Sequence, residues 1–231
     1  MDEKSTGLNR QKEAVYAAYE RWSETYDQQV NPTRDLSSAV LKQLVPPLKG
    51  LVIVEAGCGT GLNTTWLAQG CQSLLGLDFS DSMLALAREK VDQPHVQLCK
   101  HDLREVWPIK SQTADLVVIN LVLEHIPNLE QVLSHAATAM KPNAKLIITE
   151  YHPDLVAKGL GARIENNGTD IIDILNHWHP VESYVTAGQA VRLTLETISH
   201  WCEMLDENGL PIQTNVDPLI MSVVLRKIDD D

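Results

Sequence analysis

A short apolar run followed by three closely spaced glycines is the feature that most constrains the fold of this chain. Residues 51–54 read Leu-Val-Ile-Val, without the alternation of a half-buried strand, so they predict a central parallel strand buried on both faces. Gly57, Gly59 and Gly61 follow at a spacing of two. Glycine lets the backbone turn sharply and lets a ligand approach closely, because it has no Cβ. We expect a helix over residues 60–69, whose N-terminus would favour a negative group at the turn.

Polar residues follow the later strands of the predicted sheet. Asp78 ends a second apolar run, Asp102 follows a third, and Asn120 ends a fourth. The carboxyl ends of parallel strands meet at one edge of a sheet, where open α/β folds place their ligands. A carboxylate there can accept two hydrogen bonds from the vicinal hydroxyls of a ribose. The sequence therefore predicts a pocket for a nucleotide-type cofactor.

The spacing of the glycines argues against a dinucleotide. That fingerprint is Gly-x-Gly-x-x-Gly/Ala. Counted from Gly57, the third glycine position is occupied by Leu62, and counted from Gly59 it is occupied by Thr64. An NAD(P)-dependent oxidoreductase is therefore the less favoured alternative for this chain.

The pattern Glu55-x-Gly57-x-Gly59-x-Gly61 instead resembles the first motif of the class I S-adenosylmethionine (SAM) methyltransferases. Within that family the chain is similar to the small-molecule methyltransferases of ubiquinone and menaquinone biosynthesis, the type 11 domain. The resemblance implies that SAM is the cofactor and S-adenosylhomocysteine the product. It also implies methyl transfer to a small-molecule acceptor, and the alternative that stays open is a non-catalytic SAM-binding regulator or partner subunit.

The resemblance assigns cofactor contacts to particular residues. In the family, the acid at the end of the second strand holds the ribose, the acid after the third strand and its neighbour contact the adenine, and the glycine turn cradles the methionine half. A tyrosine near the end of the first helix closes over the cofactor, although the aromatic stripe of that helix could instead pack on the core. The expected cofactor residues are Tyr26, Glu55, Gly57, Cys58, Gly59, Gly61, Asp78, Phe79, Met83, Asp102, Leu103 and Asn120.

Catalysis is harder to assign, because methyl transfer depends mainly on positioning the acceptor and excluding water. The family has no universal catalytic residue. A histidine has an ordinary pKa near 6.5, which suits proton removal at neutral pH. His152, just beyond the fifth strand, and His125, at the start of a helix, are the candidate bases. Each also has a purely structural explanation, His152 in a His-Pro turn and His125 as a helix-start residue.

The resemblance implies an α/β, Rossmann-like class I methyltransferase fold. We expect a seven-stranded, mostly parallel sheet with an antiparallel last strand and helices on both faces. Residues 1–231 would form a single domain, with an N-terminal helical cap at 10–47. A substrate-covering insertion at 151–195, between strands five and six, would end in a hairpin at 182–195 that could extend a sheet across a homodimer. A helix over 197–208 would follow.

Composition excludes several partners. The net charge of −12, without a basic cluster longer than a pair, disfavours nucleic acid, whose binding depends on neutralising phosphates. The four cysteines have no metal-ligand spacing. The polar N-terminus does not resemble a signal peptide, and no apolar run approaches 18 residues. We therefore expect a cytoplasmic protein that binds no membrane and no metal.

Overall fold

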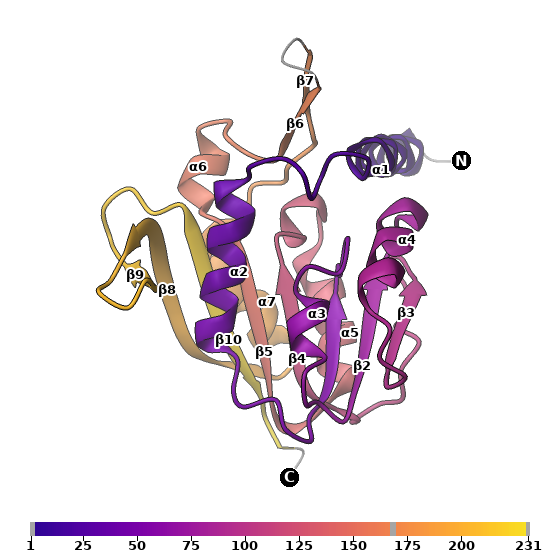
Figure 1. Cartoon of the computed structure of the whole chain (residues 1–231), viewed down its shortest axis with the longest axis vertical. Coiled ribbons are helices and arrows are strands. Elements are labelled where there is room, and N and C mark those ends of the chain that lie inside the picture. Colours follow the sequence, from indigo (N-terminus) through magenta and orange to yellow (C-terminus); the bar gives the residue numbers. More distant parts are fainter. Residues whose placement is uncertain (1–2, 167–169, 230–231) are drawn as a thin grey trace.

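The chain is built around one eight-stranded sheet. The computed structural model describes residues 3–166 and 170–229. The strands lie in the order β3-β2-β1-β4-β5-β10-β8-β9 (Figure 1). They are β1 (Val52–Ala56), β2 (Ser73–Asp78), β3 (Val96–Lys100), β4 (Ala114–Asn120), β5 (Met140–Tyr151), β8 (Leu193–Leu205), β9 (Pro211–Gln213) and β10 (Ile220–Lys227). Strands β1 to β5 pair in parallel, and β10, β8 and β9 add antiparallel pairs. The predicted fold class is confirmed, with eight strands in place of seven.

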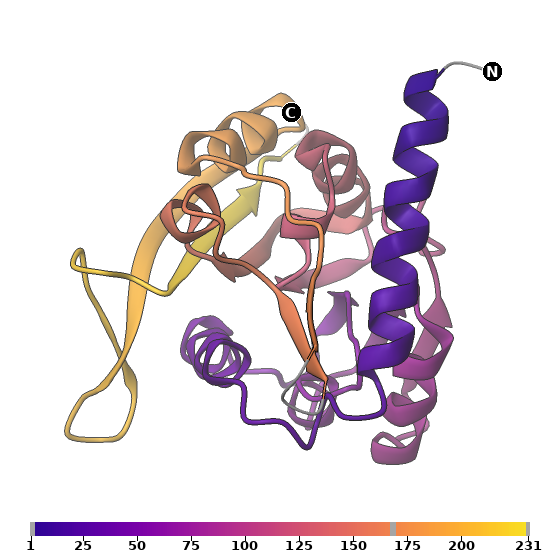
Figure 2. The ribbon, with the colours of Figure 1, turned by 90° about the horizontal axis from the view of Figure 1, so that it is seen from above.

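Helices cover both faces of the sheet. Figure 1 shows α2 and α3 in front of the sheet and α5 and α7 behind it. The long helix α1 runs beside α4 (Figure 2). The helices are α1 (Glu3–Trp22), α2 (Pro32–Leu44), α3 (Thr64–Leu67), α4 (Asp81–Lys90), α5 (Leu129–Ala139), α6 (Pro153–Ala157) and α7 (Val181–Ala190), with the 3₁₀ turn η1 (Leu123–His125). None of the helices in the described part of the chain is long and apolar enough to cross a membrane.

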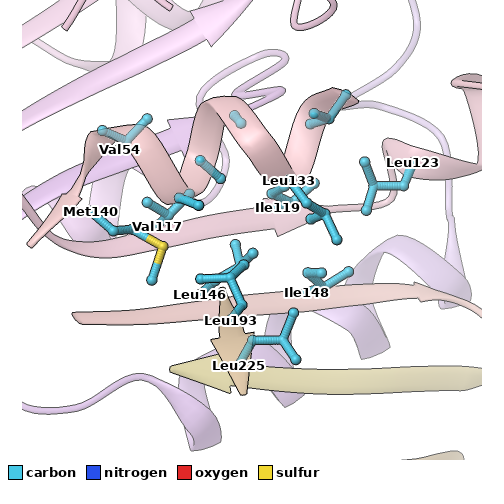
Figure 3. Packing of buried hydrophobic residues seen from close by; sticks show 14 of the residues in the cluster. Val54, Val117, Ile119, Leu123, Leu133, Met140, Leu146, Ile148, Leu193 and Leu225 are labelled. Atoms are coloured by element: carbon cyan, nitrogen blue, oxygen red, sulfur yellow. The ribbon is translucent and has the colours of Figure 1, made fainter. Parts of the chain in front are cut away.

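Each face of the sheet has its own apolar core, because successive side chains of a strand point to opposite faces. Ile53 of β1 packs with α2 and α3, whereas Val54 packs on the α5 side. Figure 3 shows Leu133 of α5 among Ile119 of β4 and Leu146 of β5. Burying a leucine side chain fully, as here, contributes roughly 1.5–3 kcal/mol. These two cores hold the strand ends in fixed relative positions.

The second half of the sheet differs from the prediction. The hairpin expected at 182–195 is wrong, because residues 181–190 form α7. Pro180 directly precedes this helix, as suits a helix start, and Gly188 lies where an added Cβ would be 3.0 Å from Leu225. The helix expected at 197–208 is also wrong, because residues 193–205 pair with β10 as β8. The proposed extension of a sheet across a homodimer loses its structural basis with the hairpin.

The cap and the insertion frame the carboxyl ends of the strands. Helix α1 begins at Glu3, ahead of the expected cap boundary at residue 10, and α2 ends at Leu44. The insertion after β5 contains α6 and a two-stranded sheet, β6 (Arg163–Asn166) with β7 (Asp170–Asp173), which projects from the main sheet (Figure 1). Helix α3 is only four residues long, because the glycine turn continues through Gly61, whose φ is +80°.

Candidate active site

The carboxyl ends of the first four strands enclose a cavity of about 120 Å³. After β3 the chain returns to add β4 on the other side of β1, and ligands of open α/β sheets bind at such a reversal. Most of the expected cofactor residues line the cavity, namely Tyr26, Gly57, Gly59, Asp78, Phe79, Met83, Asp102, Leu103 and Asn120. His125 lines it as well, together with Val15, Tyr19, Arg104, Leu121, Val122, Ile126, Pro127, Leu175 and His177.

Asp78 is the buried acid of the cavity. Its Oδ2 accepts a hydrogen bond from the backbone N–H of Gly59 at 2.8 Å, and its Oδ1 accepts one from that of Ser80 at 2.9 Å. Burial raises the pKa of this carboxyl to about 6, against the lowering effect of these hydrogen bonds. A carboxylate has about four lone-pair sites, so each oxygen can accept a further bond from a ligand. The two backbone bonds fix the carboxylate beside the glycine turn.

Aromatic side chains of α1 and of the segments that follow α1 and β2 close one side of the cavity. The ring of Phe79 lies 5.7 Å from that of Tyr16 and 5.9 Å from that of Tyr19, measured between centroids. Trp22 and Tyr26 make an edge-on pair at 4.8 Å. The aromatic stripe of the first helix therefore packs on the body of the protein and also contributes Tyr19 and Tyr26 to the cavity wall.

Two acidic residues fasten the cap to the cavity. The carboxylate of Glu20 accepts hydrogen bonds from the hydroxyls of Ser80, at 2.6 Å, and Ser82 at the start of α4. Asp27 accepts a bond from the hydroxyl of Thr60, in the glycine turn, at 2.8 Å and pairs with Lys90. The cap is thus linked to the two segments that carry the glycines and Asp78.

Asp102 already has a partner in the structure. Arg104 donates from Nε to Oδ1 at 2.9 Å and from Nη2 to Oδ2 at 2.7 Å, a bidentate pair. Leu103, which lies between these two residues in the sequence, is buried. A ligand that donates to Asp102 must therefore share this carboxylate with Arg104.

The backbone after β4 is bent sharply at the cavity. Leu121 has a φ of +54°, a left-handed conformation that costs a branched residue about 1–3 kcal/mol. The side-chain oxygen of Asn120 is held by the hydroxyls of Ser37 and Thr149. Val122 then packs so closely on Gly57 that an added Cβ there would lie 2.2 Å from Cγ2 of Val122. This contact explains why the first turn position must be a glycine.

His125 joins the cap to the insertion. Its Nδ1 lies 3.0 Å from the carbonyl oxygen of Leu175, which can only accept, so Nδ1 carries the proton. Nε2 therefore accepts from the hydroxyl of Tyr19 at 2.8 Å. Burial lowers the pKa of His125 to about 4, so the ring is neutral at physiological pH.

Comparison with known proteins shows that the chain is similar to methyltransferases. Residues 54–148 match a family model described as a methyltransferase domain. An uncharacterised methyltransferase of Emericella nidulans is 28% identical over 74% of this chain and 73% of its own length. The human mitochondrial ubiquinone biosynthesis O-methyltransferase is 29% identical over 75% of this chain but only 45% of its own length. Residues 54–148 thus match a methyltransferase domain, and the chain is similar to methyltransferases over about three quarters of its length.

The fold of this chain is shared by solved structures of low sequence identity. The crystal structure of a protein from Listeria monocytogenes described as a putative SAM-dependent methyltransferase superposes with a TM-score of 0.68 at 17% identity. The match covers 84% of this chain and 99% of that chain. At this identity the likeness concerns the fold.

Three of the expected cofactor residues lie behind the cavity wall and do not line the cavity. Glu55 is buried, its Oε2 accepts from the hydroxyl of Thr64 at 2.6 Å, and burial raises its pKa to about 8. The sulfur of Cys58 points into the core beneath the turn, 3.2 Å from the position that a Cβ added to Gly76 would occupy. Gly61 leaves room for α4, because a Cβ there would lie 3.1 Å from Ala87. These residues support the turn and do not line the cavity.

His152, the other candidate base, lies elsewhere. It lines neither the cavity at the strand ends nor the larger one next to it. Its Nδ1 accepts from the backbone N–H of Asp154 at 3.3 Å, so its Nε2 donates to Nδ1 of His200 at 2.9 Å. The side chain is buried and caps α6. The structure thus does not bring His152 together with the other predicted site residues.

Several residues that line the cavity were not among the residues predicted from the sequence. Val122, Ile126 and Pro127 lie in the segment that follows β4, so their position after Asn120 was a usable signal. The signals for Arg104 and Tyr19 were less specific, since Arg104 directly follows the predicted Leu103 and Tyr19 belongs to the aromatic stripe of the first helix. Leu175 and His177 come from the insertion, and no motif connects that segment to the cavity.

Proposed function

We propose that this methyltransferase binds SAM in the cavity at the strand ends and transfers a methyl group to a small-molecule acceptor. The observation that carries the proposal is the buried carboxylate of Asp78, fixed by the N–H groups of Gly59 and Ser80 with lone pairs left for a ligand. A ribose with two vicinal hydroxyls matches those lone pairs. The named relatives and the Listeria structure support the choice of cofactor.

The residues of the cavity fit SAM part by part. Asp78 would hold the ribose hydroxyls, and Phe79 with Met83 would flank the adenine. Asp102 would accept from the adenine amino group while it remains paired with Arg104. Gly59 has no heavy atom within 4 Å of its Cβ position, so the turn has open space for the methionine half. When bound, SAM supplies a methyl group activated by a sulfonium.

The protein's own contribution is to position the acceptor and exclude water. Tyr19 and Leu175 bring the cap and the insertion over the cavity, and His125 holds both. The Nε2 lone pair of His125 is engaged by Tyr19, so this histidine positions the tyrosine as long as the cap is closed. Positioning and desolvation of this kind suffice for an acceptor that arrives as a good nucleophile.

We expect the Asp78→Ala variant to bind S-adenosylhomocysteine roughly 10–150-fold more weakly than the wild type, because charge-assisted hydrogen bonds to the ribose are lost. Isothermal titration calorimetry measures the affinity, and circular dichroism checks that the variant is folded. Asp81→Ala, at an exposed position on α4, should bind like the wild type.

A folded Asp78→Ala variant with wild-type affinity would remove Asp78 from the ribose role. Turnover is tested separately by mass spectrometry, as conversion of SAM to S-adenosylhomocysteine with a panel of small-molecule acceptors. Tight binding with no turnover on any acceptor would favour the non-catalytic regulator instead.

A further inference from the structure

The carboxyl of Glu150 holds the turn that follows β4. Glu150 lies next to the carboxyl end of β5 and is buried, with 1% of its surface exposed. Its Oε1 accepts hydrogen bonds from the backbone N–H groups of Val122 and Leu123, each at 3.0 Å, and its Oε2 accepts one from that of Glu124 at 3.3 Å. Converging backbone N–H groups form concavities that bind anions, and here the anion is a side chain of the protein itself.

This turn forms part of the wall of the proposed cofactor site. Leu121 and Val122 line the cavity at the strand ends, and Leu121 also lines the larger cavity next to it. The φ of Leu121, +54°, is a strained conformation that persists only where the surrounding structure fixes it. The N–H of Leu121 donates to the carbonyl of Thr149 at 2.8 Å, and the next three N–H groups donate to Glu150. The strained turn is therefore held by β5.

The strength of this anchor depends on the charge of Glu150. An ionised carboxylate accepts hydrogen bonds at both oxygens, and such charge-assisted bonds are roughly twice as strong as neutral ones. A protonated carboxyl carries an O–H group on one oxygen, and that group donates. Protonation of Glu150 would therefore weaken its bonds to the turn, and the strain at Leu121 would be less well opposed.

The titratable groups near Glu150 come from the cap, from η1, from the insertion and from α7, and none of them is a cation at neutral pH. Burial raises the pKa of Tyr19 and of Tyr184 well above the usual range. Burial and the charge of Glu150 do the same for Glu124, which therefore keeps its proton. Burial lowers the pKa of each nearby histidine, so these rings are neutral: His125, His177 and His179.

The surroundings thus bring the titration of Glu150 into the neutral range. Burial raises its pKa to about 7, against the lowering effect of the three backbone N–H groups. Glu150 is mainly ionised above this pH and mainly neutral below it. The anchor of the turn is accordingly strong on the alkaline side and weak on the acidic side.

We propose that Glu150 is a positioning residue of the cofactor site, whose ionised carboxyl holds the turn after β4 in the shape that binds the cofactor. This inference rests on the proposed methyltransferase function and adds a regulation of the same site by pH. A ligand that needs the ordered turn binds the ionised form more tightly than the neutral form. Cofactor affinity is therefore greatest above pH 7 and falls as the pH decreases through the pKa of Glu150.

The test compares the affinity of the wild type and of Glu150→Gln for S-adenosylhomocysteine, by isothermal titration calorimetry at several pH values. Glutamine keeps the shape of the side chain and carries one donor and one acceptor, like the protonated acid. We expect the wild type to bind roughly tenfold more tightly than Glu150→Gln at about pH 8.5, and equally at about pH 5.5. Protonation of Asp78 or of the ligand affects both proteins alike, so the ratio isolates Glu150. A ratio that stays constant over this range would overturn the proposal.

A second measurement needs neither a ligand nor a variant. In the ligand-free, ¹⁵N-labelled wild type, the amide resonances of Val122, Leu123 and Glu124 should shift together with a midpoint near pH 7, because all three donate to the same carboxyl. Amides that do not shift in this range would show that the carboxyl does not titrate there, and would also overturn the proposal.

Controls separate the two proposals. Glu130→Gln, at an exposed position in the first turn of α5, should follow the wild type at every pH. S-adenosylhomocysteine binding to the wild type is measured first. Its absence would overturn the proposed function and with it the role of Glu150 in cofactor binding, whereas binding with a constant ratio would overturn the role of Glu150 alone.

Discussion

The Gly57→Ala variant should lose about 2–5 kcal/mol of its free energy of unfolding, the largest effect we expect from a change of one methyl group. The φ of Gly57 is +82°, which strains any residue with a side chain. The new Cβ would also lie 2.2 Å from Cγ2 of Val122, well inside contact distance. Urea denaturation of the ligand-free protein measures the loss.

Gly59→Ala is the matched control for this prediction. Its φ of +51° is also left-handed, but no heavy atom lies within 4 Å of its Cβ position. It should therefore lose only the backbone term, about 1–2 kcal/mol. Adding Val122→Ala to Gly57→Ala should recover part of the loss, as a coupling energy between the two sites. Equal losses at Gly57 and Gly59, with no coupling to Val122, would show that the Val122 contact is unimportant.

A second large effect concerns the dependence of stability on pH. The pKa of Glu55 is about 8 in the folded protein, because burial disfavours its charged form, compared with 4.5 as its ordinary value. The folded state therefore holds this proton more tightly than the unfolded state. The stabilisation is complete below pH 4.5 and is lost as the pH rises to 8, by about 3–5 kcal/mol from this group alone.

The Glu55→Gln variant lacks this titration. The difference between its free energy of unfolding and that of the wild type should rise by about 3–5 kcal/mol between pH 4.5 and pH 8. Urea denaturation at several pH values gives the profile, and Glu89→Gln, exposed on α4, should run parallel to the wild type. A parallel profile for Glu55→Gln would mean that Glu55 is charged in the folded protein.

The sequence was most informative where one residue type is required by local geometry. Only glycine fits at position 57, next to Val122, and Asp78 ends a strand beside the glycine turn. Both residues therefore belong to a recognisable sequence motif. Because the buried strands could be recognised from their apolar runs, Asp102 and Asn120 could be placed at the same edge of the sheet as Asp78. For this reason the first five strands and most of the cavity wall could be predicted.

The rest of the sheet depends on contacts between distant segments. Residues 193–205 have no strong local signal, and pairing with β10 makes them a strand. Gly188 suggested a hairpin turn, but it lies inside α7. A glycine is present there because an added Cβ would lie 3.0 Å from the side chain of Leu225. Leu175 and His177 reach the cavity from the insertion through bonds to residues of η1, which no local pattern reports.

The two hydrogen bonds of His125 link segments more than 150 residues apart in the chain, Tyr19 in α1 and Leu175 after β7. A ligand that immobilises one of these two segments also orders part of the other. A second ligand, which contacts that other segment, then loses less conformational entropy when it binds. Cofactor and acceptor would then bind cooperatively without any further change of shape. Amide exchange in α1 should accordingly slow when a ligand contacts only the segment after β7.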